Sequence, residues 1–172
     1  MHHFIYHGSI SEHGTRNAMI LLSKALRNGS EAITLHIGSH GGDVNAGITL
    51  YNFVRMLPIE THVHAFGVCE SIAATVLLAG KRRTAAPAAR ITVHAPKYSE
   101  GPNAGKPTAD VDLISAPFRT VCNWSDADIA ERFSEVGEFR MTPESAVELA
   151  VINDIWEPLL SPADEVTVIS VG

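Results

Sequence analysis

The 172-residue sequence has only two cysteines, Cys69 and Cys122, which are too few for a disulfide framework. It has no run of about eighteen apolar residues, so no membrane span is predicted. No spacing of cysteine and histidine is typical of a structural zinc site, and the first residues do not form an export signal. These shortages predict a cytoplasmic protein that needs neither a metal ion nor a cofactor.

Positive charge is also scarce, with 13 Lys and Arg against 19 Asp and Glu and a net charge of −6. Nucleic acids and anionic membrane surfaces are bound through clustered basic residues, so neither is expected as a partner. The one basic cluster, residues 81–83, follows an expected helix and is interpreted as a solvated turn.

The composition is that of a globular protein, with 45% hydrophobic and 19% charged residues and no internal repeat. A chain of this length forms one domain, here residues 1–172, and buries about two thirds of its unfolded surface. One globular domain with a single core is therefore expected.

Strand patterns alternate with helix patterns along the first half of the chain. Strands are predicted at residues 4–6, 32–37, 61–66 and 89–94, and helices at 15–27, 44–57 and 71–80. This alternation indicates an α/β fold with a parallel sheet and right-handed crossovers. In the second half Pro117 interrupts a long helix over 110–124. Further elements are predicted as helices 125–133 and 142–150, an extended piece 153–156 and a strand 165–171.

Ser71 is the candidate nucleophile suggested by this pattern. The strand 61–66 meets Gly67, a turn follows, and Ser71 opens a buried helix of small apolar residues. The first N–H groups of a helix have no partner within it, so an oxyanion beside Ser71 would meet donors that include the amide of Ile72. The alternative is that Ser71 only caps the helix, which is a common role of serine.

Two further features end the neighbouring strands. Gly41 and Gly42 follow strand 32–37, where the Gly42 N–H can approach a substrate as a second oxyanion donor. His94 ends strand 89–94 at the same edge of the sheet and could act as the general base of Ser71. A phosphate-binding loop is disfavoured because the glycine spacings of such loops are missing. A structural role for His94 remains the alternative.

Four stretches resemble motifs of the ClpP peptidases. Ser39-His-Gly-Gly-Asp-Val-Asn-Ala-Gly47 is similar to their Ser-Pro-Gly-Gly-x-Val-x-Ala-Gly, and Phe66-Gly-Val-Cys-Glu-Ser-Ile-Ala-Ala74 to the segment that carries the nucleophile. Pro87-x-x-Arg-Ile-x-Val-His-x-Pro96 resembles the segment that carries the histidine. Met141-Thr-Pro-Glu-Ser-Ala146 resembles the helix start that follows the third catalytic residue. The resemblance covers residues 4–157, which leaves 158–172 as a C-terminal tail or strand.

The resemblance implies a serine endopeptidase on the ClpP/crotonase fold of stacked ββα units. Ser71 would be the nucleophile, His94 the base, and the amides of Gly42 and Ile72 the oxyanion hole. The position of the third catalytic residue, an aspartate in the family, is occupied by Glu138, and the nearby Glu135 is the alternative.

The expected partners follow from the same resemblance. A peptide or unfolded protein would lie as an extended strand beside Gly41 and Gly42, and the chain would form a homo-oligomeric ring. A Clp-type ATPase is the further partner that the family implies.

This sequence departs from the family pattern at several places. His40 replaces a proline, and Glu70 is an acid directly before Ser71 that would either raise the pKa of His94 or face solvent. The chain begins at the first strand, without the segment that forms axial loops, and Pro117 interrupts the region of the long handle helix. These last two features argue against ATPase docking and a double ring.

Two other functions stay open on the sequence. A crotonase-type acyl-CoA enzyme would use the same two amides without a serine nucleophile, although the pairing of Ser71 with His94 speaks against it. A catalytically silent ring or assembly subunit is the other, suggested by the altered third residue.

Overall fold

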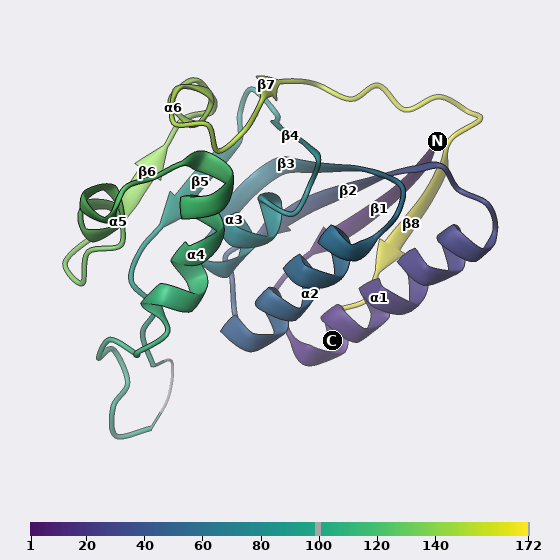
Figure 1. The fold of residues 1–172 in the computed structure, drawn as a ribbon. Coiled ribbons are helices and arrows are strands. Elements are labelled where there is room, and N and C mark those ends of the chain that lie inside the picture. Colours follow the sequence, from purple (N-terminus) through teal and green to yellow (C-terminus); the bar gives the residue numbers. More distant parts are fainter. Residues whose placement is uncertain (99–100, 172) are drawn as a thin grey trace.

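The protein is one α/β unit built on a single sheet (Figure 1). In residues 1–98 and 101–171, which the computed structural model describes, eight strands pair in the order β6-β5-β3-β2-β1-β8, with β4 between β3 and β7 on a side branch. All pairs are parallel except β5 with β6. The predicted parallel α/β architecture is confirmed.

Most predicted strands are present, and several are longer than expected. The strands are β1 (His2–His7), β2 (Ala32–Ser39), β3 (Glu60–Glu70), β4 (Arg82–Ala85), β5 (Arg90–Val93), β6 (Phe139–Met141), β7 (Asp154–Ile155) and β8 (Glu165–Ile169). Strand β8 pairs with β1, so the last strand in the sequence lies beside the first one, at the edge of the sheet.

Four of the helices in the described residues begin after a residue whose side chain caps them. The helices are α1 (Glu12–Arg27), α2 (Val44–Met56), α3 (Ile72–Leu77), α4 (Val111–Cys122), α5 (Asp126–Arg132) and α6 (Pro143–Glu148), and the four with such a cap are α1, α2, α5 and α6. The side chains of Asp43 and Thr142 accept from main-chain N–H groups three residues on, and Ser125 forms a capping box with Asp128. Among the helices of the described residues, none is long and apolar enough to cross a membrane.

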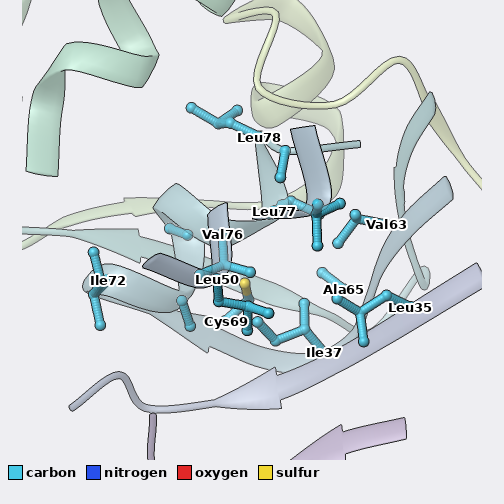
Figure 2. Packing of buried hydrophobic residues seen from close by; sticks show 14 of the residues in the cluster. Leu35, Ile37, Leu50, Val63, Ala65, Cys69, Ile72, Val76, Leu77 and Leu78 are labelled. Carbon is cyan, nitrogen blue, oxygen red and sulfur yellow. The ribbon is translucent and has the colours of Figure 1, made fainter. Parts of the chain in front are cut away.

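The core lies between the sheet and helices α1, α2 and α3. Figure 2 shows residues of β2 and β3 packed against α3 and Leu50 of α2. All six residues of α3 are buried, as the small apolar pattern after Ser71 predicted. Each large aliphatic side chain removed from water in this way contributes about 1.5–3 kcal/mol, so α3 is held by its packing although it is very short.

Strand β3 continues through the turn that was predicted at residues 67–70, so that prediction was wrong. Its first half pairs with β4, from His62 to Ala65, and its last three residues pair with β5, from Val68 to Glu70. The register with β2 shifts between Ile37 and Ser39, where β3 holds extra residues. Pairing with β5 satisfies the main chain of residues that would otherwise have formed a turn.

The basic cluster at residues 81–83 was also misjudged, because Arg82 begins β4. The guanidinium of Arg83 donates to the carbonyl oxygens of Val151 at 2.9 Å and of Ala150 at 3.4 Å. Arg82 lies over the ring of Trp156, 5.2 Å from its centroid. These arginines hold the α6–β7 segment against the sheet, which local charge patterning could not reveal.

Pro117 lies inside α4 and does not break it, contrary to the expectation of an interrupted helix. A proline in a helix interior costs about 3 kcal/mol through the missing N–H and the ring clash. Burial of Ile114 and Phe118 offsets this cost, and Thr75 of α3 donates to the Ile114 carbonyl at 3.0 Å. Tertiary packing therefore outweighs the local effect of the proline.

A row of histidines crosses one face of the sheet. His3 Nδ1 lies 2.9 Å from His36 Nε2, and the rings of His36 and His64 meet edge to face. His62 and His64, alternate residues of one strand, both contact Thr84 Oγ1 at 2.7 Å. Burial lowers the pKa of His36 and of His62 to about 4 and that of His64 to about 3. These rings are therefore neutral at pH 7.

The histidine row predicts that acid destabilises the fold. A histidine whose pKa is lowered by folding takes up its proton in the unfolded chain first, so stability is full above about pH 6.5 and is lost as the pH falls toward 4. For His36 alone the loss by pH 5 is about 2 kcal/mol. Urea unfolding midpoints measured between pH 7 and pH 5 check this.

A matched pair of variants tests whether the buried histidines cause the loss of stability in acid. His36→Gln should weaken the pH dependence, whereas His13→Gln, at an exposed position on α1, should leave it unchanged. A midpoint that stays constant from pH 7 to pH 5 in the unmodified protein would contradict the assignment.

Candidate active site

Ser71 stands at the sharp turn between β3 and α3. Its φ of 57° and ψ of −130° lie in a region that non-glycine residues rarely adopt, and its N–H donates to the Thr92 carbonyl at 2.8 Å. Strain of this kind persists where surrounding contacts enforce it, often at functional sites. The side chain of Ser71 makes no capping hydrogen bond, so the alternative that it only caps the helix is wrong.

The glycine loop after β2 lies directly against Ser71. A Cβ on Gly41 would be 2.7 Å from Ser71 Cβ and 3.3 Å from its Oγ. The loop is anchored on its other side, where the N–H of Ile10 donates to the Gly41 carbonyl and the N–H of Asp43 donates to the Ile10 carbonyl, both at 2.9 Å. The structure therefore brings together two segments that are thirty residues apart.

Two main-chain donors remain unused in the segments that meet at Ser71. In the described part of the chain, no hydrogen bond uses the N–H of Gly42 or of Ile72. Ile72 is the first residue of α3, where the N–H has no acceptor within the helix. A loop amide and a helix-terminal amide near one hydroxyl form a suitable arrangement for an oxyanion.

His94 follows the end of β5, two residues after the carbonyl that holds Ser71. Its Nδ1 donates to the carbonyl of Ala95 at 2.8 Å, and no hydrogen bond joins its ring to Ser71 Oγ in the structure as described. The ring is partly buried. His94 is thus placed on the neighbouring strand but is turned toward its own main chain.

Glu138 comes just before β6, which runs antiparallel to β5. The pairing of Val93 with Phe139, extended by one residue, places Glu138 opposite His94 on the same face of the sheet. The Glu138 carboxylate instead accepts from Arg140, at 2.9 Å from Nη2 and 3.2 Å from Nε. Glu135 is exposed in the loop before β6. The register favours Glu138 over Glu135 as the partner of His94.

Glu70 does not face open solvent, which was one of the two roles expected for it. Its carboxylate is 17% exposed and accepts from Arg90 at 2.9 Å, with His40 Nδ1 2.6 Å away on its other oxygen. Partial burial alone would raise the pKa of Glu70, but the hydrogen bonds from His40 and Arg90 outweigh it and lower that pKa. Glu70 is therefore held by His40 and Arg90 and does not face open solvent.

Sequence reasoning missed Arg90 and Thr92 as parts of this site. Both alternate with His94 on β5 and share its face, and Thr92 supplies the carbonyl for Ser71 together with a hydroxyl 3.4 Å from Glu70 Oε1. The strand predicted at residues 89–94 could have indicated both residues, because side chains two residues apart on a strand lie on the same face as each other.

The surroundings of the site include a hollow of about 510 Å³ lined by Gly41, His40, Phe66 and Val68. A second groove, of about 610 Å³, lies between α1 and α2 and shares no residue with the site. In the ranges 1–98 and 101–171, no three His, Cys, Asp or Glu side chains gather as metal ligands would. The chemistry available at the site is that of a hydroxyl, an imidazole, carboxylates and main-chain amides.

A sequence model of the family described as Clp protease matches residues 3–158. This chain belongs to the Clp protease family. The ATP-dependent Clp protease proteolytic subunit 1 of Mycobacterium tuberculosis is 30% identical over 141 residues, which cover 81% of this chain and 64% of that protein. The protein of the same name from Corynebacterium jeikeium is 31% identical over 120 residues, or 69% of this chain and 59% of that protein.

The chain spans less than two thirds of the length of these curated relatives. A solved structure of a ClpP1 mutant from Listeria monocytogenes matches with a TM-score of 0.80 over 91% of both chains, at 21% identity. This likeness confirms the predicted ClpP/crotonase fold, with a mainly parallel sheet flanked by helices.

The contact between Gly41 and Ser71 predicts that Gly41→Ala destabilises the protein. Gly41 has a φ of +99°, and the added Cβ would collide with Ser71 Cβ and lie 3.0 Å from the Glu70 carbonyl oxygen. We expect a loss of about 1–3 kcal/mol in the free energy of unfolding, measured with urea. Gly67→Ala is the control, because a Cβ there meets nothing within 4 Å. Equal midpoints for the two variants would refute the described packing.

Proposed function

We propose that this chain is a serine endopeptidase of the ClpP type, with Ser71 as nucleophile. The observation that carries the proposal is the Ser71 turn itself. It is a strained serine with an uncommitted hydroxyl, followed by Ile72 with an unused N–H and packed against Gly41, whose neighbour Gly42 also has an unused N–H. Membership of the Clp protease family and the names of the relatives support the same activity.

The mechanism is acyl transfer to Ser71 and then to water. His94 takes the proton of Ser71 Oγ as that oxygen attacks a peptide carbonyl, and the amides of Gly42 and Ile72 stabilise the resulting oxyanion. The intermediate collapses, the C–N bond breaks, and the amine leaves with the proton from His94. Water then attacks the acyl-enzyme with His94 again as base, which releases the acid and restores Ser71.

Two side chains must turn for this mechanism to operate. Nδ1 of His94 has to leave the Ala95 carbonyl so that Nε2 can accept from Ser71 Oγ, and the Glu138 carboxylate has to leave Arg140 and accept from that Nδ1. The strand register already places Glu138 opposite His94, so side-chain rotation suffices. Catalytic hydrogen bonds are often misaligned before substrate binds. Glu138 would then orient the imidazole and stabilise its protonated form.

The substrate we propose is a peptide or an unfolded protein in extended form. Gly41 and Gly42 follow β2 and have no side chains, and the N–H of Gly42 is unused in the described residues, so an extended peptide can lie beside them and pair at Gly42 by strand addition. The adjoining hollow of about 510 Å³ gives room for its side chains.

We also propose that the chain works as a homo-oligomer, in which copies form a ring. Parallel sheets are normally covered on both faces, yet the face that carries the histidine row also has Val166, Val168 and Phe66 exposed at 43%, 68% and 38%. The apolar groove between α1 and α2 is a second surface to cover. Neighbouring copies in a ring, one on each side of a protomer, would bury both surfaces.

A Clp-type ATPase is the additional partner that the names of the relatives imply. The intact helix α4 removes one of the two arguments against it, because Pro117 does not interrupt this region.

A catalytically silent ring or assembly subunit is the second candidate function. The contacts of His94 with Ala95 and of Glu138 with Arg140 favour it, since both hold potential catalytic groups away from Ser71. The experiments below separate the two candidates. No contact in the described residues favours the third, a crotonase-type acyl-CoA enzyme.

Ser71→Ala should abolish hydrolysis of short fluorogenic peptides, with kcat falling by at least about a thousandfold. A fluorophosphonate probe should label the unmodified protein at Ser71 only, as read by peptide mass spectrometry. Ser145→Ala, on α6, is the matched control and should retain full activity. Equal hydrolysis by the unmodified protein and Ser71→Ala would refute the mechanism, and the absence of hydrolysis and labelling would leave the silent subunit.

Glu138→Gln should lower kcat about ten- to a thousandfold, because a neutral side chain orients His94 but stabilises its charged form poorly. Glu135→Gln is the comparison and should change kcat by less than about twofold. If kcat fell in Glu135→Gln and not in Glu138→Gln, Glu135 would be the third catalytic residue. If kcat fell in neither variant, neither carboxylate would take part in the mechanism.

A further inference from the structure

The carboxylate of Glu70 joins three segments that meet at the candidate site. Its Oε2 lies 2.6 Å from His40 Nδ1, while Arg90 donates to Oε1 at 2.9 Å from Nη2 and 3.2 Å from Nε. His40 follows β2, Glu70 ends β3, and Arg90 begins β5. The Glu70 side chain is only 17% exposed, and His40 and Arg90 reach it from more exposed positions, with side chains 78% and 50% exposed.

The loop that carries His40 needs such an anchor because of its two glycines. Gly41 and Gly42 have φ values of +99° and +148°, and glycine loses more conformational freedom on ordering than any other residue. The side chain of His40 is 78% exposed, and its one hydrogen bond within the described residues is to Glu70. That contact closes the loop over the turn at Ser71.

The position of this loop decides the geometry of the oxyanion donors. Gly41 touches Ser71, and Gly42 carries one of the two free N–H groups. Oxyanion donors act from about 2.7–3.1 Å, and a misplacement of about 1 Å can cost a hundredfold in rate. A tether at the residue before Gly41 and the residue before Ser71 acts directly on that spacing.

We propose that Glu70 is a positioning residue, which through His40 holds the Gly41–Gly42 loop against Ser71 and sets the spacing of the two oxyanion donors. The inference rests on the proposed peptidase function. Arg90 holds the other oxygen of the carboxylate from β5, the strand that leads to His94. One carboxylate therefore links the Gly41–Gly42 loop, the turn at Ser71 and strand β5, which leads to His94. Because His40 stands where the related motif has proline, which has no side-chain donor, this pairing is a property of this chain.

Peptide hydrolysis by His40→Ala and Glu70→Ala tests the proposal, with kcat and KM measured separately. The donors act on the transition state, so kcat should fall about ten- to a hundredfold while KM stays within about twofold. The double variant should be no slower than the slower single variant, because both changes cut the same tether. His40→Asn, whose amide can donate from nearly the position of Nδ1, should restore most of the activity.

The contrary outcomes are equally specific. A lower kcat in Glu70→Ala with an unchanged kcat in His40→Ala would overturn the proposal, because Glu70 would then act through Arg90 alone. A rise in KM with kcat unchanged would also overturn it, since the loop would then bind substrate without positioning the donors. His13→Ala, on the exposed side of α1, is the control for both measurements.

Hydrogen exchange over residues 38–43 is a second readout that does not need peptide turnover. Exchange there should be faster in His40→Ala and in Glu70→Ala than in the unmodified protein and His13→Ala. Unchanged exchange would overturn the tether whatever the kinetics show. If the unmodified protein cleaves no peptide but the exchange responds, the proposed function fails and the tether stands.

Discussion

The hydrogen bond from the Ser71 N–H to the Thr92 carbonyl, 2.8 Å long, is the contact on which the candidate site depends. It closes the last part of β3 onto β5, after β3 has exchanged β4 for β5 as its neighbour. Since β5 leads on to His94, the contact that holds the strained backbone of Ser71 also brings the imidazole to the same edge of the sheet. Without this exchange, the end of β3 would pair only with β2, at Cys69, and the backbone of Ser71 would lose the contact that holds it.

Charge has a local role in this site although the protein is acidic as a whole. Glu70 stays ionised in a partly buried position because Arg90 and His40 supply hydrogen bonds to both of its oxygens. A single carboxylate next to the nucleophile would be expected to disturb an imidazole nearby, but here its charge is balanced within three neighbouring segments. The buried histidines of the sheet differ from Glu70, because burial lowers their pKa values and keeps the rings uncharged.

Local sequence patterns predicted the elements that local physics controls. The helix over 44–57 was visible from its apolar period and from Pro58, and the helix after Thr142 from its cap and Pro143. The same rules failed at Pro117, at β4 and at residues 67–70, where packing or strand pairing outweighed local propensity. Each failure lies where a segment distant in the sequence supplies the missing partner, such as the α6–β7 segment that binds Arg83.

The sequence by itself determined the parallel α/β order, the strand ends at Gly41, Ser71 and His94, and the family to which the chain belongs. Periodicity and glycine position express the strand order and the strand ends within short windows, where main-chain geometry dominates, whereas the family was indicated by the resemblance of four motifs. Only the tertiary structure decided that Gly41 touches Ser71, that Glu70 binds His40 and Arg90, and that His94 and Glu138 have other partners. These contacts join residues from separate strands, and side-chain direction at a strand end depends on register and packing that no local pattern contains.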